Sequence, residues 1–186
     1  LLKGTKSYEE KEMYGYIFNT SSPYDIISNK FLSKEEITKI HLAEEAFDRF
    51  YNKNHYKQAI NFVLDNVSNA YNFFYELGCI EINSKKLEDT FKLLDSFVKD
   101  NINLDYNEFH KLLILDYLKC FNIKPTSWWN ERISPKEKNE ILRINHENNN
   151  LDYDLNTLYK YSLVIPLNKC IVVAIYKNNS KKIHII

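Results

Sequence analysis

Residues 33–67 read SKEEITKIHLAEEAFDRFYNKNHYKQAINFVLDNV and contain the clearest helical pattern in the chain. Ser33 and Glu36 form a capping box, in which the hydroxyl and the carboxylate satisfy reciprocal backbone N–H groups at a helix start. The apolar residues that follow recur on one face, as a 3.6-residue period requires. We therefore expect a helix that ends at about Asn52. Its apolar face holds Ile37, Ile40, Phe47 and Tyr51.

A second helix is predicted after a short break at His55. Its apolar residues fit the i, i+3, i+4, i+7 template. They are Tyr56, Ala59, Ile60, Val63, Leu64 and Val67. Two helices joined by so short a connection favour an antiparallel pair.

Four more helices and three strands are predicted downstream. The helical patterns begin at about residues 71, 84, 106 and 134. The first, third and fourth end at about residues 77, 121 and 145, and the second has Leu87, Phe91, Leu94 and Val98 on its inner face. The β-branched runs at 161–167, 170–176 and 182–186 predict an antiparallel meander. The expected fold class is α+β and mainly α. About six helices form a bundle-like array within residues 31–150, and a three-stranded antiparallel meander lies within residues 158–186.

The balance of charge argues against one class of function. Lys plus Arg equals Asp plus Glu at 25 each, so the chain lacks the overall positive field that displaces counterions from phosphates. Only Arg49, Arg132 and Arg143 supply guanidinium groups for bidentate recognition. We do not expect nucleic-acid binding, although a local basic patch stays open.

The cysteines and the hydropathy indicate where in the cell the protein is found. Cys79, Cys120 and Cys170 are odd in number and widely spaced, which favours free thiols in a reduced compartment. No apolar run approaches the roughly 18 residues of a membrane span. The expectation is a soluble cytoplasmic protein.

No cluster of residues predicts catalysis, a cofactor or a metal ion. His41 and Glu45 stand one turn apart, but no second ligand cluster accompanies them. Residues 152–156 resemble the start of a calcium loop, yet Thr157 replaces the required Gly and Leu163 the bidentate Glu. We interpret the first pair as a solvated flank and the second stretch as an acidic loop. We therefore predict no catalytic, cofactor-binding or metal-binding residue in this chain.

The first forty residues read like the end of one domain running into another. The chain starts at Leu1 without an initiator Met, and patterned sequence begins almost at once. Residues 14–18 alternate like a brief strand and meet turn-forming residues at 19–23. We expect the chain to be a piece of a longer protein.

A resemblance to a known family rests on short stretches in a fixed order. They are Leu2-Lys3-Gly4-Thr5, Tyr14-Gly15-Tyr16, Pro23-Tyr24-Asp25-Ile26-Ile27, Phe31-Leu32-Ser33, Glu44-Glu45, Tyr51-Asn52, Leu115-Asp116-Tyr117-Leu118 and Pro125 to Trp129. In this order and spacing they resemble the C-terminal region of bacterial B12-binding radical SAM proteins, a domain of unknown function. The resemblance covers most of the chain up to about residue 130.

The resemblance implies a place in a larger enzyme. In that family a cobalamin domain and a radical SAM partial barrel come first, so residues 1–30 would leave the barrel and residues 31–186 would form an accessory domain. The Cys-x3-Cys-x2-Cys cluster loop has no match here, so this part would hold no cofactor and catalyse nothing by itself. The parent would use a 4Fe–4S cluster, S-adenosylmethionine and cobalamin. The partners would be the radical SAM and B12-binding domains of the same polypeptide.

The function expected on this basis is a non-catalytic accessory domain that shapes substrate access or docks a partner. The residues expected to face another domain or the substrate are Glu44, Tyr51, Asn52, Asp116 and Trp128. The main alternative is a stand-alone helical protein-interaction module. Two further possibilities are a single-strand nucleic-acid binder, which would stack bases on Trp128 and Trp129, and a small metal-dependent enzyme.

Overall fold

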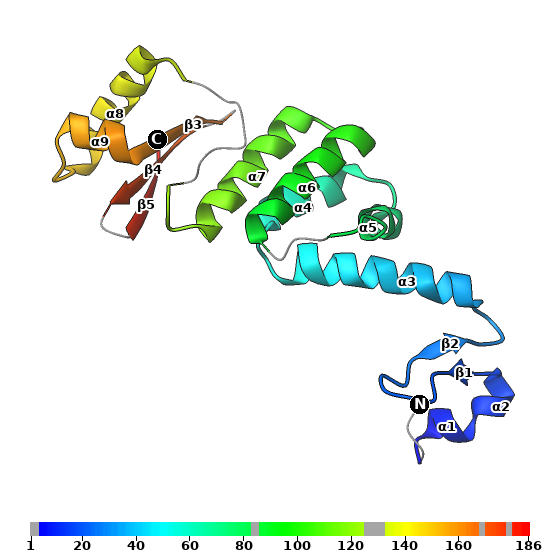
Figure 1. Ribbon diagram of the computed structural model, residues 1–186. Coiled ribbons are helices and arrows are strands. Elements are labelled where there is room, and N and C mark those ends of the chain that lie inside the picture. Colours follow the sequence, from blue (N-terminus) through cyan, green and yellow to red (C-terminus); the bar gives the residue numbers. More distant parts are fainter. Residues whose placement is uncertain (1–3, 83–85, 125–132, 168–169, 178–179) are drawn as a thin grey trace. The chain divides into compact units, whose positions relative to one another are not determined.

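The computed structural model describes residues 4–82, 86–124, 133–167, 170–177 and 180–186 (Figure 1). The chain divides into two compact units. Unit 1 takes Leu1–Lys53 and Val67–Asn83, and unit 2 takes Asn54–Asn66 and Ser84–Ile186. The two helices predicted within residues 33–67 therefore belong to different units.

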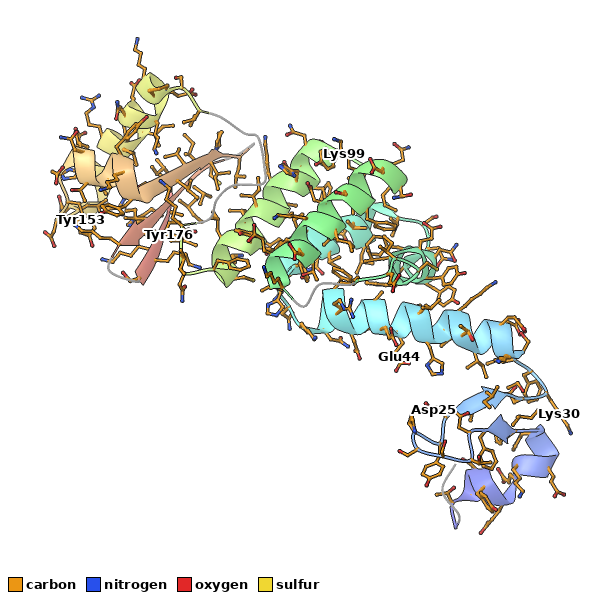
Figure 2. The ribbon with its side chains drawn as sticks, viewed as in Figure 1. Asp25, Lys30, Glu44, Lys99, Tyr153 and Tyr176 are labelled. Carbon is orange, nitrogen blue, oxygen red and sulfur yellow. The ribbon has the colours of Figure 1, made fainter. Side chains whose placement is uncertain are left out.

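Unit 1 begins with two helical turns and a small hairpin. Its elements are α1 (Lys6–Glu9), α2 (Lys11–Tyr14), β1 (Ile17–Phe18) and β2 (Ile26–Ser28), with β1 antiparallel to β2. Gly15 ends α2 at φ 63°, a left-handed conformation that glycine adopts readily. Lys30, labelled in Figure 2, donates from Nζ to the Met13 carbonyl at 2.6 Å. This bond ties the segment after β2 to α2.

The long helix of unit 1 is α3 (Lys34–Phe47), and it starts with the predicted capping box. Ser33 Oγ accepts from the Glu36 N–H at 3.2 Å, and Glu36 Oε2 accepts from the Ser33 N–H at 2.7 Å. The helix continues into a π-helical segment, η1 (Asp48–Asn52), so the helical run ends at the predicted residue. A π-helix has i→i+5 hydrogen bonds and is rare.

Helix α5 (Ala70–Gly78) packs on α3 through small residues. Ala43 and Ala46 are buried on the α3 side. A Cβ atom added at Gly78 would lie 2.1 Å from the Leu42 carbonyl oxygen. The absence of a side chain at residue 78 is therefore what lets the two helices approach so closely.

The helices of unit 2 enclose an aromatic core. They are α4 (Lys57–Asn66), α6 (Leu87–Asn101) and α7 (Tyr106–Cys120), and α7 contacts both others. The ring of Phe91 lies 4.5 Å from that of Tyr56 and 5.1 Å from that of Tyr117, between centroids. These separations are typical of favourable aromatic pairs.

A helix–sheet layer completes unit 2. It contains α8 (Pro135–Asn149), α9 (Leu155–Tyr161), β3 (Ser162–Pro166), β4 (Ile171–Lys177) and β5 (Ser180–Ile185). The strands form an antiparallel sheet with β4 in the middle. One sheet face supplies Val173 and Ile175 to a core cluster with Ile141, Leu142 and Leu158. Val172 and Ala174 on the other face are also buried, which explains why β4 is apolar from Ile171 to Ile175.

Lysines from distant parts of unit 2 cap helix C-termini. Lys181 Nζ donates to the carbonyls of Leu118, Lys119 (2.9 Å) and Phe121 (3.0 Å) at the end of α7. Lys138 Nζ donates to the carbonyls of Tyr159 (3.0 Å) and Ser162 (3.1 Å) at the end of α9. A cation at this position satisfies unpaired carbonyls and complements the helix dipole. The pKa of each ammonium group is lowered, and burial is the main cause.

The predicted fold class is confirmed. The described residues are mainly helical and end in an antiparallel sheet of order β3-β4-β5. The six predicted helices correspond to α3 through α8, although α8 extends past the expected end at residue 145. The proposed boundary at residue 30 stays a prediction.

Three helices in the described residues were not expected: α1, α2 and α9. With four residues each, α1 and α2 are too short to show a helical stripe. Helix α9 starts within the stretch interpreted as an acidic loop. Its cap is Asp154, which accepts from the Thr157 N–H at 2.9 Å and the Thr157 hydroxyl at 2.6 Å. The Asp154 carboxylate therefore serves as the N-cap of α9. The sequence interpretation treated this carboxylate as part of an acidic loop and so missed the helix.

Gly78→Ala is expected to destabilise the protein, even though alanine favours a helix over glycine by about 1 kcal/mol. The new methyl group would overlap the Leu42 carbonyl, and overpacking costs about 1–3 kcal/mol. Urea unfolding followed by circular dichroism measures the net loss. Asn72→Ala, at an exposed site of α5, is the control and should not lower the free energy of unfolding. A Gly78→Ala protein as stable as the wild type would contradict the close approach.

Candidate docking surface

An apolar groove of about 400 Å³ lies between α3 and α5 in unit 1. It is lined by Ile40, Ala43, Glu44, Phe47, Ala70, Tyr71 and Phe74. Glu44 supplies the charge in this lining, and the other six residues supply apolar surface. The groove is therefore suited to an apolar occupant with a polar group near Glu44.

Aromatic side chains build the groove. Phe47 stacks on Tyr51 with ring centroids 4.8 Å apart, and its edge meets Phe74 at 5.1 Å. Four large side chains of this region are each more than a third exposed: Ile40 (41%), Phe47 (37%), Tyr51 (41%) and Tyr71 (45%). Single exposed apolar residues are common, but a contiguous group of this kind marks an interaction site.

A second hollow of about 570 Å³ lies beside the first part of α3. Its lining consists of Tyr24, Asp25, Ile26, Asn29, Leu32, Ile37, Ile40 and His41. Because Ile40 lines both hollows, they adjoin along the helix. We define the α3 face as the apolar residues of this surface: Tyr24, Ile26, Leu32, Ile37, Ile40, Phe47, Tyr51, Tyr71 and Phe74.

Charged groups lie around the α3 face. His41 Nδ1 is 3.3 Å from Glu44 Oε2, and both side chains are exposed. Figure 2 shows Glu44 projecting outward from α3. Lys39 Nζ lies 5.9 Å from the ring centre of Tyr75. His41 and Glu44 line the two hollows beside the apolar residues, as polar rim residues do in protein interfaces.

Two of the five predicted interface residues lie at the α3 face. Glu44 lines the groove, and Tyr51 stacks on Phe47. Asn52 is exposed beside Tyr51, and its Nδ2 donates to Asp48 Oδ1. Trp128 lies outside the described residues. A role for these residues at an interface stays a prediction.

Asp116, the remaining predicted residue, is buried on α7, where it caps α4. Its Oδ2 accepts from the N–H groups of Gln58 (2.7 Å) and Ala59 (3.0 Å), and its Oδ1 accepts from Gln58 Nε2 (3.2 Å). The carboxylate thus satisfies helix N-terminal donors from a different helix. Burial raises the pKa of Asp116 above its ordinary value, while the N–H donors act in the opposite direction.

Sequence reasoning missed a polar cluster that joins α6 to α7. His110 Nδ1 lies 2.7 Å from Asp95 Oδ1, and the Tyr106 hydroxyl donates to the same oxygen at 3.0 Å. The side chains of His110 and Asp95 are only 13% and 15% exposed. Burial, reinforced by the Asp95 carboxylate, raises the pKa of Tyr106. The residues come from separate helices, so no spacing within one helix could have indicated the cluster, which links the two helices.

Metal clusters and membrane-spanning helices are both absent from the described part of the chain. No group of three or more His, Cys, Asp or Glu side chains is placed there to hold a metal ion. Within those same residues no helix combines the length and apolar character needed to cross a membrane.

Fold and surface together define a mainly helical protein with an apolar face on α3 and a C-terminal meander. Residues 12–182 match the model of a family described as a protein of unknown function (DUF4080). The chain belongs to this family. No curated protein and no solved structure matches the chain.

Asp116→Asn should lower the free energy of unfolding by about 1–2 kcal/mol at neutral pH, because an amide has one acceptor oxygen and cannot accept from both the α4 backbone N–H groups and Gln58 Nε2. Denaturant unfolding measures the change. Asp65→Asn, at an exposed site of α4, is the matched control and should shift stability by no more than about 0.5 kcal/mol. Equal effects of the two substitutions would contradict the capping role.

The raised pKa of Asp116 predicts a specific pH dependence. Between the ordinary value of 3.8 and the higher folded value, the folded protein binds more protons than the unfolded chain. The stability that Asp116 contributes is thus fully present below pH 3.8, and it falls as the pH rises through the pKa of Asp116 in the folded protein. The difference in unfolding free energy between wild type and Asp116→Asn should therefore shrink with rising pH. Unfolding curves over a pH series would show it, and a growing difference would contradict it.

Proposed function

We propose that this chain is a non-catalytic C-terminal accessory domain of a cobalamin-binding radical SAM enzyme. The support for the enzyme class is the ordered resemblance that runs from Leu2 to Trp129. Membership in the family leaves the activity open, because the family's description names none. The support for a docking role comes from the α3 face.

The single observation that carries the docking role is the exposed apolar centre of the α3 face. Phe47, Tyr51 and Tyr71 are rigid aromatic side chains that are 37–45% exposed. Aromatic residues of this kind are enriched at the centre of interfaces, where they exclude water. Hollows of about 400 and 570 Å³ beside them would receive side chains of a partner.

We infer that the occupant is the catalytic barrel that precedes this domain in the same polypeptide. The α3 face includes Tyr24 and Ile26, which lie in the segment that the resemblance assigns to the barrel exit. A domain tethered at the edge of its own docking surface has an effective concentration in the millimolar range. A modest apolar surface is then sufficient for stable docking.

The cofactors of the parent belong to the preceding domains under this proposal. The 4Fe–4S cluster and S-adenosylmethionine would be bound by the radical SAM barrel, and cobalamin by its own domain. Cys79, Cys120 and Cys170 do not have the Cys-x3-Cys-x2-Cys spacing of the cluster loop. The accessory domain would act by covering or shaping the entrance to the barrel, or by docking a further partner.

The α3 face also favours a second candidate, a stand-alone helical protein-interaction module. In that case the surface would serve a partner encoded by another gene. The two candidates differ in what lies upstream of Leu1, and they can be separated by reading that coding sequence.

The coding sequence upstream of Leu1 is expected to encode a Cys-x3-Cys-x2-Cys motif within a βα-repeat pattern and, before it, a cobalamin-binding domain. The reason is that the resemblance places both ahead of this region. Sequencing of the gene provides the check. An upstream region without the cysteine motif would refute the radical SAM assignment and leave the interaction module.

Hydrogen–deuterium exchange on the full-length polypeptide tests docking at the α3 face. Tyr51→Asp places a charge in the apolar centre, so the backbone amides of α3 and α5 should exchange at least severalfold faster than in the wild type. Ile144→Asp on α8 is the matched control, because Ile144 is 38% exposed and lies in unit 2. Unchanged exchange in Tyr51→Asp, with the fold intact by circular dichroism, would exclude a partner on this face.

A further inference from the structure

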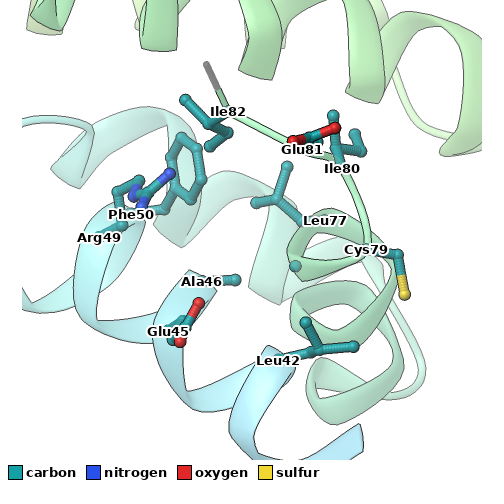
Figure 3. Close-up of a pocket in the computed structure, with 11 residues that line it drawn as sticks. Leu42, Glu45, Ala46, Arg49, Phe50, Leu77, Cys79, Ile80, Glu81 and Ile82 are labelled. Atoms are coloured by element: carbon teal, nitrogen blue, oxygen red, sulfur yellow. The ribbon is translucent and has the colours of Figure 1, made fainter. Parts of the chain in front are cut away.

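A separate hollow of about 380 Å³ lies on another side of the α3–α5 pair (Figure 3). Its walls come from the end of α3, from η1 and from the end of α5 with the segment that follows it. The lining residues are Leu42, Glu45, Ala46, Arg49, Phe50, Leu77, Gly78, Cys79, Ile80, Glu81 and Ile82. This volume is in the range of small-molecule sites.

The floor of this hollow is apolar and well ordered by packing. Ala46, Phe50 and Leu77 are 4%, 1% and 0% exposed. Gly78 brings α5 against the backbone of Leu42, and both residues line the hollow. An apolar group placed on this floor would lose contact with water on most of its surface.

The π-helical segment η1 shapes the rim. It begins at Asp48, so Arg49 and Phe50 lie in the part of the helix where hydrogen bonds run i→i+5. Such segments are uncommon and are found frequently at functional sites. Here the altered turn coincides with the residues that supply the guanidinium group and the aromatic floor. The coincidence is an observation independent of the hollow itself.

Three charged side chains surround the apolar floor. Figure 3 shows the guanidinium group of Arg49 and the carboxylate of Glu81 on opposite sides, with the carboxylate of Glu45 on the α3 wall. Glu45 precedes Arg49 by four residues, a spacing that favours an ion pair on a regular helix. Yet Arg49 forms no ion pair with Glu45 or Glu81 among the described residues. Each of these charges is available to a ligand.

The charge pattern selects the class of ligand. A phosphate or dicarboxylate would meet two carboxylates and one guanidinium group, which is net repulsion. A purely apolar molecule would cover three charges without compensating them. A ligand with one carboxylate, one ammonium group and an apolar body pairs with Arg49 and Glu81 and covers the floor, while Glu45 stays exposed to water. A carboxylate can bind the guanidinium fork in bidentate geometry.

We propose that this hollow binds an apolar α-amino acid or a compound with the same zwitterionic group. Arg49 receives the carboxylate, Glu81 on the opposite side receives the ammonium group, and the side chain lies on Phe50 and Leu77. The proposal rests on this hollow alone and does not depend on the function proposed for the α3 face.

Isothermal titration calorimetry on the protein with three probes tests the ligand class. L-Leucine carries both charges, 4-methylpentanoate only the carboxylate, and 3-methylbutylamine only the ammonium group. Leucine should bind in the millimolar range or tighter, and each analogue should bind at least about tenfold more weakly. Absence of leucine binding up to about 10 mM, or equal binding of 4-methylpentanoate, would overturn the proposal.

Matched variants locate the site. Arg49→Gln and Glu81→Gln should each weaken leucine binding by about tenfold or more, because each removes one charge-assisted contact. Arg143→Gln and Glu140→Gln remove the same charges from exposed positions of α8 and should leave binding unchanged. If the α8 variants weakened binding as much as the others, the ligand would lie elsewhere and the assignment to this hollow would be wrong. The probe series on the wild-type protein decides the ligand class even if a variant fails to fold.

Discussion

The contact between Gly78 and the backbone of Leu42 sets the geometry of unit 1. Helices that pack on residues as small as Gly78, Ala43 and Ala46 approach closely and leave little room between them. Large side chains then have to lie at the edges of the helix pair. Phe47 and Tyr71 are therefore partly exposed as a consequence of packing, and the apolar groove and the charged hollow occupy different edges of the same pair.

Unit 2 depends instead on charges that act at helix ends from distant parts of the chain. Asp116 on α7 satisfies the first N–H groups of α4, and Lys181 on β5 satisfies the last carbonyls of α7. A buried charge is costly unless it is paired or fully hydrogen-bonded, and helix termini offer several donors or acceptors in one place. These bonds link the helices to each other and to the sheet more specifically than apolar contacts do.

Sequence patterns predicted what local periodicity and caps determine, and little else. The Ser33 capping box, the stripe at Phe91, Leu94 and Val98, and the β-branched strands each express a physical rule that acts within a few residues. Packing partners do not follow from such rules: α3 packs on α5, and α4 packs on α7. For the same reason Asp116 was identified through a resemblance, while its capping role depends on Gln58, far away in the sequence. The hollow beside Arg49 needed both the π-helical turn and Gly78, and neither has a sequence signature.

The two surfaces of unit 1 differ in a way that assigns them to different kinds of partner. The α3 face presents aromatic side chains with charges at its rim, so its binding energy would grow with the area covered, which suits a protein. The hollow beside Arg49 places three charges around a small apolar floor, so its binding energy would come from a few directed contacts, which suits a small molecule. Both surfaces share α3 and α5 as walls. A ligand that shifted α5 on α3 would alter the groove as well, since Phe74 and Leu77 lie on the same short helix. The close packing at Gly78 thus holds in place a helix that lines both surfaces.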